Sequence, residues 1–191
     1  MDGILGSLGA INVSAGATLS GAGSLQRTVN ISGTLSPGAG VGSIKTNALT
    51  LNDGSTLALE LASVASFDQV SVTGTVTLNG AVNLALNLSF DPIDRVDSFT
   101  LIANDGNEAI AGSTGRLSFG GNLLDEGSNF RVGEQDFVIS YIGGTGNDVV
   151  IRAVPEPGSG ALLTGALALV GFLRPRRIFR DVRRRLPHAA C

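Results

Sequence analysis

Val70-Ser-Val-Thr-Gly-Thr-Val-Thr-Leu-Asn-Gly-Ala-Val-Asn-Leu-Ala-Leu-Asn-Leu-Ser89 is the most regular stretch of the sequence. Every valine and leucine in it occupies an even position, and the odd positions carry Ser, Thr, Asn and Ala. Alternation with a period of two places one set of side chains in a core and the other toward water, so the stretch predicts β-strands. Asn79-Gly80 is a turn pair that can separate two strands.

Short segments that begin with glycine recur before this stretch and within it. They are Gly16-Ala-Thr-Leu19, Gly33-Thr-Leu35, Gly54-Ser-Thr-Leu57 and Gly74-Thr-Val76. Their last residues are 16, 22 and 19 positions apart. A spacing near 20 residues with glycine turns is typical of a β-solenoid, in which each coil stacks on the next. Hairpins in a β-sandwich are the alternative.

Further strands are expected at 99–103, 117–119, 137–142 and 148–153 because these segments are rich in apolar and β-branched residues. Glycine contributes 27 of 191 residues and tryptophan is absent, a composition that favours turns and strands over helices. We therefore expect residues 1–153 to form an all-β domain. Its rungs would be those of a right-handed parallel β-helix, and residues 85–152 would form either further coils or a β-sandwich.

The C-terminal part changes character at Val154-Pro155-Glu156-Pro157. A linker at 154–160 precedes an uncharged apolar run at 161–173, which predicts the one hydrophobic helix of transmembrane type. A basic tail follows at 174–191, and its first arginines, Arg174, Arg176 and Arg177, would stop the segment in the membrane. A buried helix of a soluble protein is the alternative for so short a run.

Charge divides the chain at the same place. Residues 1–157 carry six basic and 15 acidic side chains, a net charge of −9, whereas residues 158–191 carry seven arginines and one aspartate, a net charge of +6. Basic segments stay on the cytoplasmic side of a membrane, so the acidic body is expected outside the cytoplasm. The acidic body also argues against nucleic acid as a partner, because binding to phosphates needs basic patches.

The motif, the apolar run and the arginine cluster, in this order, resemble the C-terminal sorting signal of PEP-CTERM bacterial surface proteins. The body resembles autotransporter-like β-strand repeats at Gly33-Thr-Leu-Ser-Pro-Gly38, Phe67-Asp-Gln-Val70, Gly74-Thr-Val-Thr-Leu-Asn-Gly80, Asp97-Ser-Phe-Thr-Leu101 and Gly143-Gly-Thr-Gly-Asn-Asp-Val-Val150. The resemblance implies an exported, β-helical structural or adhesive protein. It also implies that an exosortase-type processing enzyme recognises Val154, Pro155, Glu156 and Pro157.

The resemblance therefore implies a precursor held in the inner membrane, whose body later reaches the cell envelope or the extracellular matrix. The body is rich in hydroxyl and amide side chains and has few charges, which suits packing against exopolysaccharide or against sibling repeats. The first residues, Met1-Asp2-Gly3, do not begin a secretory signal peptide, since no basic segment precedes an apolar one. We expect the sequence to be the C-terminal part of a longer surface protein.

Two groups of residues offer weaker alternatives. Gly143-Gly-Thr-Gly-Asn-Asp-Val-Val-Ile151 fits the calcium-binding RTX nonapeptide, in which Asp148 would be a ligand. Such sites need stacked copies and about six to eight oxygen ligands, so one copy favours a simple turn. Asp91, Asp94 and Asp97 could serve a polysaccharide-active enzyme on a β-helix, although surface carboxylates in a turn are the simpler interpretation.

Nothing else in the sequence points to catalysis. His188 is the one histidine and lies in the basic tail, so the body has neither a Ser-His pair nor a zinc site of the usual kind. Cys191 is the one cysteine, which excludes a disulfide within the chain. The sequence therefore predicts a non-enzymatic protein without a cofactor.

Overall fold

A computed structural model describes residues 3–4, 9–105, 108–110 and 115–155. These residues are all-β, and they belong to one contact unit, Met1–Glu156. The predicted helix at 161–173, the basic tail at 174–191 and most of the linker lie outside the described residues.

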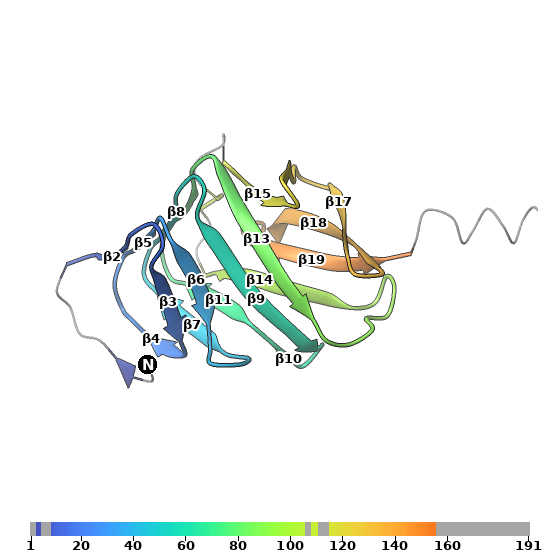
Figure 1. Ribbon diagram of the computed structural model, residues 1–191, viewed down its shortest axis with the longest axis horizontal. Helices are drawn as coiled ribbons and strands as arrows, with labels where there is room; N and C mark the ends of the chain where they lie inside the picture. Colours follow the sequence, from blue (N-terminus) through green and yellow to red (C-terminus); the bar gives the residue numbers. More distant parts are fainter. Residues whose placement is uncertain (1–2, 5–8, 106–107, 111–114, 156–191) are drawn as a thin grey trace, which may run out of the picture. The chain divides into compact units, whose positions relative to one another are not determined.

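The described strands form three β-sheets (Figure 1). The four-stranded sheet has the order β12 (Val76–Leu78), β8 (Leu49–Leu51), β5 (Val29–Ile31) and β2 (Ile11–Val13). The seven-stranded sheet has the order β16 (Asn122–Leu123), β15 (Arg116–Phe119), β13 (Ala81–Leu88), β9 (Thr56–Ser63), β6 (Thr34–Pro37) and β3 (Thr18–Gly21), and β10 (Ser66–Phe67) pairs with β9. The eight-stranded sheet has the order β1 (Gly3–Ile4), β4 (Gly23–Ser24), β7 (Ser43–Thr46), β11 (Gln69–Val72), β14 (Ser98–Asn104), β19 (Asp148–Val154), β18 (Gln135–Gly143) and β17 (Asn129–Val132).

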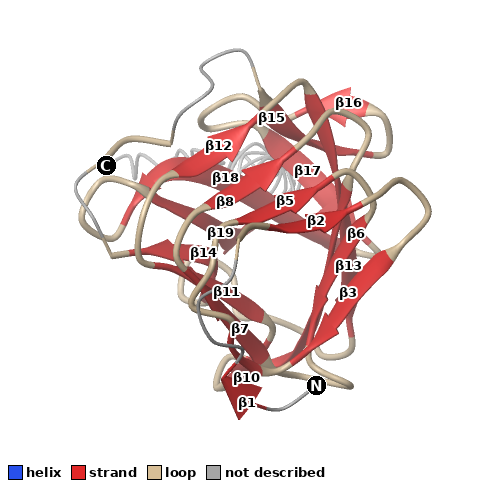
Figure 2. Cartoon of the chain, turned by 90° about the vertical axis from the view of Figure 1, so that its left-hand side faces the viewer, coloured by secondary structure: helices blue, strands red, loops and turns tan. Residues whose placement is uncertain are grey.

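From β2 to β14 the chain visits the four-stranded, the seven-stranded and the eight-stranded sheet in turn, and it repeats this order in four successive rounds. Apart from β10, which pairs antiparallel with β9, each strand of these rounds pairs in parallel with the strand of the neighbouring round in its sheet. Figure 2 shows the three sheets on three sides of the interior. Each round therefore extends all three sheets by one strand.

The register of the seven-stranded sheet confirms the first three glycine-led segments and corrects the fourth. Leu19 is opposite Leu35, and Leu35 is opposite Leu57, as the spacing predicts. The next residue in this row is Leu84, not Val76, which instead lies opposite Leu49 in the four-stranded sheet. The rounds therefore differ in length, so a spacing counted along the sequence assigned Val76 to the wrong sheet.

The alternation at 70–89 is confirmed. Val70, Val72, Val76, Leu78, Val82 and Leu84 are buried. Asn79-Gly80, however, does not form a hairpin, since β12 and β13 belong to different sheets. Gly80 has a φ of 63°, which favours glycine, and it turns the chain from one sheet into the next. The four strands expected at 99–103, 117–119, 137–142 and 148–153 correspond to β14, β15, β18 and β19.

The pairing changes from parallel to antiparallel after β14. Strand β14 pairs in parallel with β11 on one side and antiparallel with β19 on the other, and β18 and β17 continue the antiparallel order. Phe99 of β14 lies at this change and is fully buried. Its ring contacts Phe67, Phe90 and Phe137 at centroid distances of 5.3, 5.9 and 6.3 Å. Aromatic packing therefore joins the rounds to the last three strands.

Polar side chains connect successive rounds on the outside of the four-stranded sheet. The Asn30 amide donates a hydrogen bond to Asn12 Oδ1 at 2.8 Å, and the two residues are opposite each other in β5 and β2. Asn79 donates to Asn52 Oδ1 at 3.1 Å, and Asn52 donates to the Ser32 hydroxyl at 3.1 Å. These bonds reinforce the parallel register, since each one joins equivalent positions of neighbouring rounds.

Replacing Gly33 with alanine is expected to lower the free energy of unfolding by about 2–3 kcal/mol. A Cβ at Gly33 would clash with the carbonyl oxygens of Ser14 and Ala17, which belong to the backbone of the preceding round and cannot swing away. Gly54→Ala is the matched control. Its φ of 72° is unfavourable for alanine but its surroundings are open, so about 1 kcal/mol is expected. Urea unfolding measures both, and equal losses would contradict the steric explanation.

Candidate functional site

The end of the body from which the chain continues toward the basic tail is built by β19, the β17–β18 turn and the segment after β13. Val154 is the last residue of β19 and lies opposite Asp136 of β18. The Gln135 side-chain amide donates hydrogen bonds to the Val154 carbonyl at 3.2 Å and to Asp94 Oδ1 at 3.0 Å. Gln135 therefore ties the end of β19 to the turn that contains Asp94.

The predicted sorting motif begins directly at this point. Val154 and Pro155 are described and are half-buried. Glu156 and Pro157 lie outside the described residues, as do the arginines at 174, 176 and 177. Val154 is both the last residue of β19 and the first residue of the predicted motif, so the two overlap without a spacer.

The described ranges contain no helix with the length and hydropathy needed to cross a membrane.

Asp91, Asp94 and Asp97, the acidic residues considered for catalysis, follow β13 and do not line one cleft. Asp97 Oδ2 accepts a hydrogen bond from the Ile93 backbone at 2.7 Å, so this carboxylate stabilises its own turn. Asp94 accepts from Gln135. Of the three, only Asp91 is among the residues that line the neighbouring groove.

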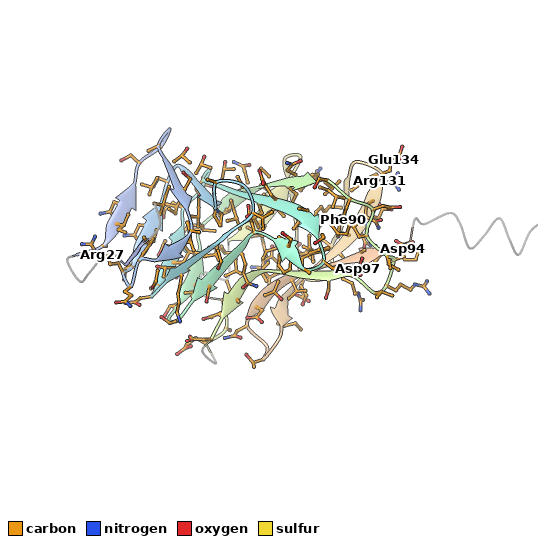
Figure 3. All side chains as sticks on the ribbon, turned by 90° about the horizontal axis from the view of Figure 1, so that it is seen from below. Arg27, Phe90, Asp94, Asp97, Arg131 and Glu134 are labelled. Atoms are coloured by element: carbon orange, nitrogen blue, oxygen red, sulfur yellow. The ribbon has the colours of Figure 1, made fainter. Side chains whose placement is uncertain are left out.

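This groove has a volume of about 720 Å³ and lies between the end of β13 and the β17–β18 turn. Figure 3 shows Phe90, Glu134 and Arg131 toward the end of the body that also carries Asp94 and Asp97, with Arg27 toward the other end. The lining of the groove combines apolar side chains with amides and carboxylates: Leu86, Asn87, Leu88, Phe90, Asp91, Val132, Gly133, Glu134 and Gln135. Such a mixed lining can contact both the flat faces and the hydroxyl groups of a sugar chain.

An ion pair closes the β17–β18 turn on one side of the groove. Arg131 Nε and Nη2 donate to the two carboxylate oxygens of Asp136 at 2.7 and 2.9 Å. These hydrogen bonds hold the pKa of Asp136 below its ordinary value, against the opposing effect of burial. The pair fixes the ends of the turn on which Glu134 and Gln135 are carried into the groove.

The Arg131–Asp136 pair is expected to make the stability depend on acid pH. Because the folded state lowers the pKa of Asp136, the ionised carboxylate stabilises the fold above the ordinary aspartate pKa of about 3.9. This contribution is lost as the pH falls through the lowered folded value. Asp136→Asn should therefore be less stable than the native chain near neutral pH, by less than about 1 kcal/mol because Arg131 is partly exposed. Urea midpoints over this pH range measure the difference, and a constant difference would contradict the assignment.

Asp148, the weak candidate for calcium binding, lies at the start of β19 after the turn formed by 143–147. Its Oδ1 accepts a hydrogen bond from the Asn104 backbone at 2.8 Å, which ties this turn to the end of β14. Thr145 donates to Asn147 Oδ1 at 2.8 Å within the turn. Within the described ranges, no three His, Cys, Asp or Glu side chains are grouped as a metal site would require.

Two residues with structural importance were not assigned a role of their own from the sequence. Asp68 is buried and accepts hydrogen bonds from the backbone of Gly42 and of Glu60. The signal that could have identified it is its even position, since the even-numbered Val70 and Val72 that follow are buried. A carboxylate on the buried side of a strand needs hydrogen-bond partners. Gln135 gave no such signal, since its partners Asp94 and Val154 are far away in the sequence.

No protein-family model matches the chain, and no curated protein matches it either. The comparisons thus assign it neither a family nor a function. What the protein does must be inferred from its own residues and their arrangement.

Proposed function

We propose that the protein is an exported structural or adhesive protein of a bacterial cell envelope, held at the inner membrane through its C-terminal part and then sorted outward. The observation that carries the proposal is the order of three features after the last strand. Pro155-Glu156-Pro157 begins at the end of β19, an apolar run follows at 161–173, and seven arginines come after it. An exosortase-type enzyme would act on the motif.

The body suits a structural role. We propose that its parallel rounds are the coils of a β-solenoid of the parallel β-helix type, and that the antiparallel strands β17, β18 and β19 close one end of it. An exposed edge strand can pair with another chain, and the antiparallel strands cover the edge that β14 would otherwise present, leaving β17 as the end strand of this sheet. Outward amides and hydroxyls, such as the ladder from Asn79 to Ser32, give the body a polar surface with few charges.

Fractionation of cells that express the native precursor tests the sorting proposal. The native protein is expected first in the membrane fraction and then outside the cell in a shortened form. Replacing Pro155, Glu156 and Pro157 with alanine should leave the full-length form in the membrane, whereas the adjacent Gly158→Ala should not. A native precursor that remains in the soluble cytosolic fraction would refute the proposal.

Exopolysaccharide is the proposed partner, and the groove beside the β17–β18 turn supports it. Asn87 and Glu134 are exposed there, and Phe90 supplies an aromatic wall. Affinity electrophoresis in a gel that contains the exopolysaccharide of the host tests this. We expect the native chain to be retarded, Asn87→Ala with Glu134→Ala to lose the retardation, and Glu108→Ala outside the groove to keep it. Equal mobility of all three would exclude the groove as the binding site.

A further inference from the structure

The turn at 92–97 exposes two large apolar side chains that the fold does not need to expose. Ile93 is 62% and Val96 is 68% exposed, two of the three highest values among the exposed large apolar side chains of the described ranges. Between them in the sequence are Asp94 and Arg95, which are also exposed. Exposed apolar side chains that are grouped on one short turn can form part of a contact surface.

The turn is held in a fixed shape. Asp97 Oδ2 accepts from the Ile93 backbone, and the Ile93 carbonyl accepts from the backbone of Val96 at 3.2 Å and of Asp97 at 3.0 Å. Arg95 has a φ of 63°, a conformation that costs a residue with a side chain about 1–2 kcal/mol. Strain of this kind persists where the surroundings enforce it, so the turn that carries Ile93 and Val96 is held in one shape.

The same turn lies beside the point where the chain leaves the body. The Arg95 backbone donates to the Ala153 carbonyl at 2.8 Å, and the Ala153 backbone donates to the Asp97 carbonyl at 3.0 Å. Only residues 156–160 separate Pro155 from the apolar run that begins at Ala161. Pro155 and Ala161 are thus six residue steps apart and can be separated by at most about 22 Å when the chain is fully extended. If the run enters a membrane, this end of the body cannot be farther from the surface than that.

We propose that Ile93 and Val96 contact the membrane surface and insert their side chains among the lipid headgroups while the protein is anchored. This inference rests on the proposed function, because it needs the run at 161–173 to be in the membrane. Apolar contact drives it, since the body carries a net charge of −9 and Asp91 and Asp94 are exposed nearby. Neutral lipid therefore suits the contact better than anionic lipid, which would repel these carboxylates.

The chain contains no tryptophan, so a single introduced tryptophan reports on one position. Ile93→Trp places it at the tip of the turn. Ile142→Trp is the matched control. Ile142 is 66% exposed and belongs to β18, where its neighbour Gly143 lies opposite the first residue of β19, about 20 Å along the strand from Val154. The full chain is incorporated into phosphatidylcholine vesicles that contain brominated phosphatidylcholine, which quenches tryptophan emission on contact. The tryptophan at position 93 should lose most of its emission, whereas the tryptophan at position 142 should lose little.

Val96→Trp repeats the test at the second side chain, and urea unfolding of each variant shows that the body is intact. If the chain does not sediment with vesicles, the anchoring part of the proposed function fails. If the chain sediments but positions 93 and 96 are quenched no more than position 142, anchoring stands and the proposed contact is wrong. Quenching at 93 and 96 alone supports the contact.

Discussion

Phe99→Ala is expected to lower the free energy of unfolding by about 3–5 kcal/mol, the usual cost of deleting a buried phenylalanine ring. Phe99 is fully buried, and its ring meets three others edge to face. These rings come from β10, from the segment after β13 and from β18, so the cavity would open where the parallel rounds meet the antiparallel strands. The surroundings cannot collapse easily into this space, because each neighbouring ring is held by its own strand or turn.

Phe119→Ala is the matched control for Phe99→Ala. Phe119 of β15 is half-buried and packs against Phe130 at a centroid distance of 5.2 Å. Its replacement should therefore lower the free energy of unfolding clearly less than Phe99→Ala does. Urea unfolding followed by circular dichroism gives both values, and unchanged slopes against denaturant would show that the comparison concerns one folded state. A loss below about 1 kcal/mol for Phe99→Ala would mean that the four rings do not form a common core.

Local patterns predicted the strands better than their partners. Alternation identified the buried side of residues 70–84, and apolar clusters located β14, β15, β18 and β19 within one or two residues. The sheet to which each strand belongs depends on the length of every intervening loop. The third round includes the eight-residue β9 and the short β10, which lengthen it and shift Val76 out of the expected row. A spacing near 20 residues could not reveal this insertion.

The candidate groove could not be predicted because its two sides are distant in the sequence. Residues 86–91 are the end of β13 and the segment after it, and residues 132–135 form the β17–β18 turn. Neither segment carries a motif, and only the antiparallel addition of β19 and β18 to β14 brings them together. The acidic residues at 91, 94 and 97 were recognisable as a turn, but their separate hydrogen-bond partners depend on this same tertiary arrangement.

Asp68→Ala is expected to lower the free energy of unfolding by about 2–4 kcal/mol. Asp68 is 1% exposed, and its two oxygens accept hydrogen bonds from Gly42 at 2.7 Å and from Glu60 at 2.8 Å. Gly42 precedes β7 of the eight-stranded sheet, and Glu60 belongs to β9 of the seven-stranded sheet. Alanine would leave both backbone donors without this acceptor, at about 1–3 kcal/mol each, and water that reaches the partly buried donors keeps the sum toward the lower end.

The pH dependence of this loss separates the carboxylate from simple packing. Burial raises the pKa of Asp68 in spite of the two donors, with a smaller contribution from the nearby Glu60. An acid with a raised folded pKa binds its proton more tightly in the fold. Its contribution to stability therefore grows as the pH falls through the folded value, until the unfolded chain is protonated as well. The gap between the native chain and Asp68→Ala should widen on acidification, whereas a gap from lost packing alone would stay constant. Asp68→Asn, which keeps the volume and one acceptor, should lose less than alanine at neutral pH.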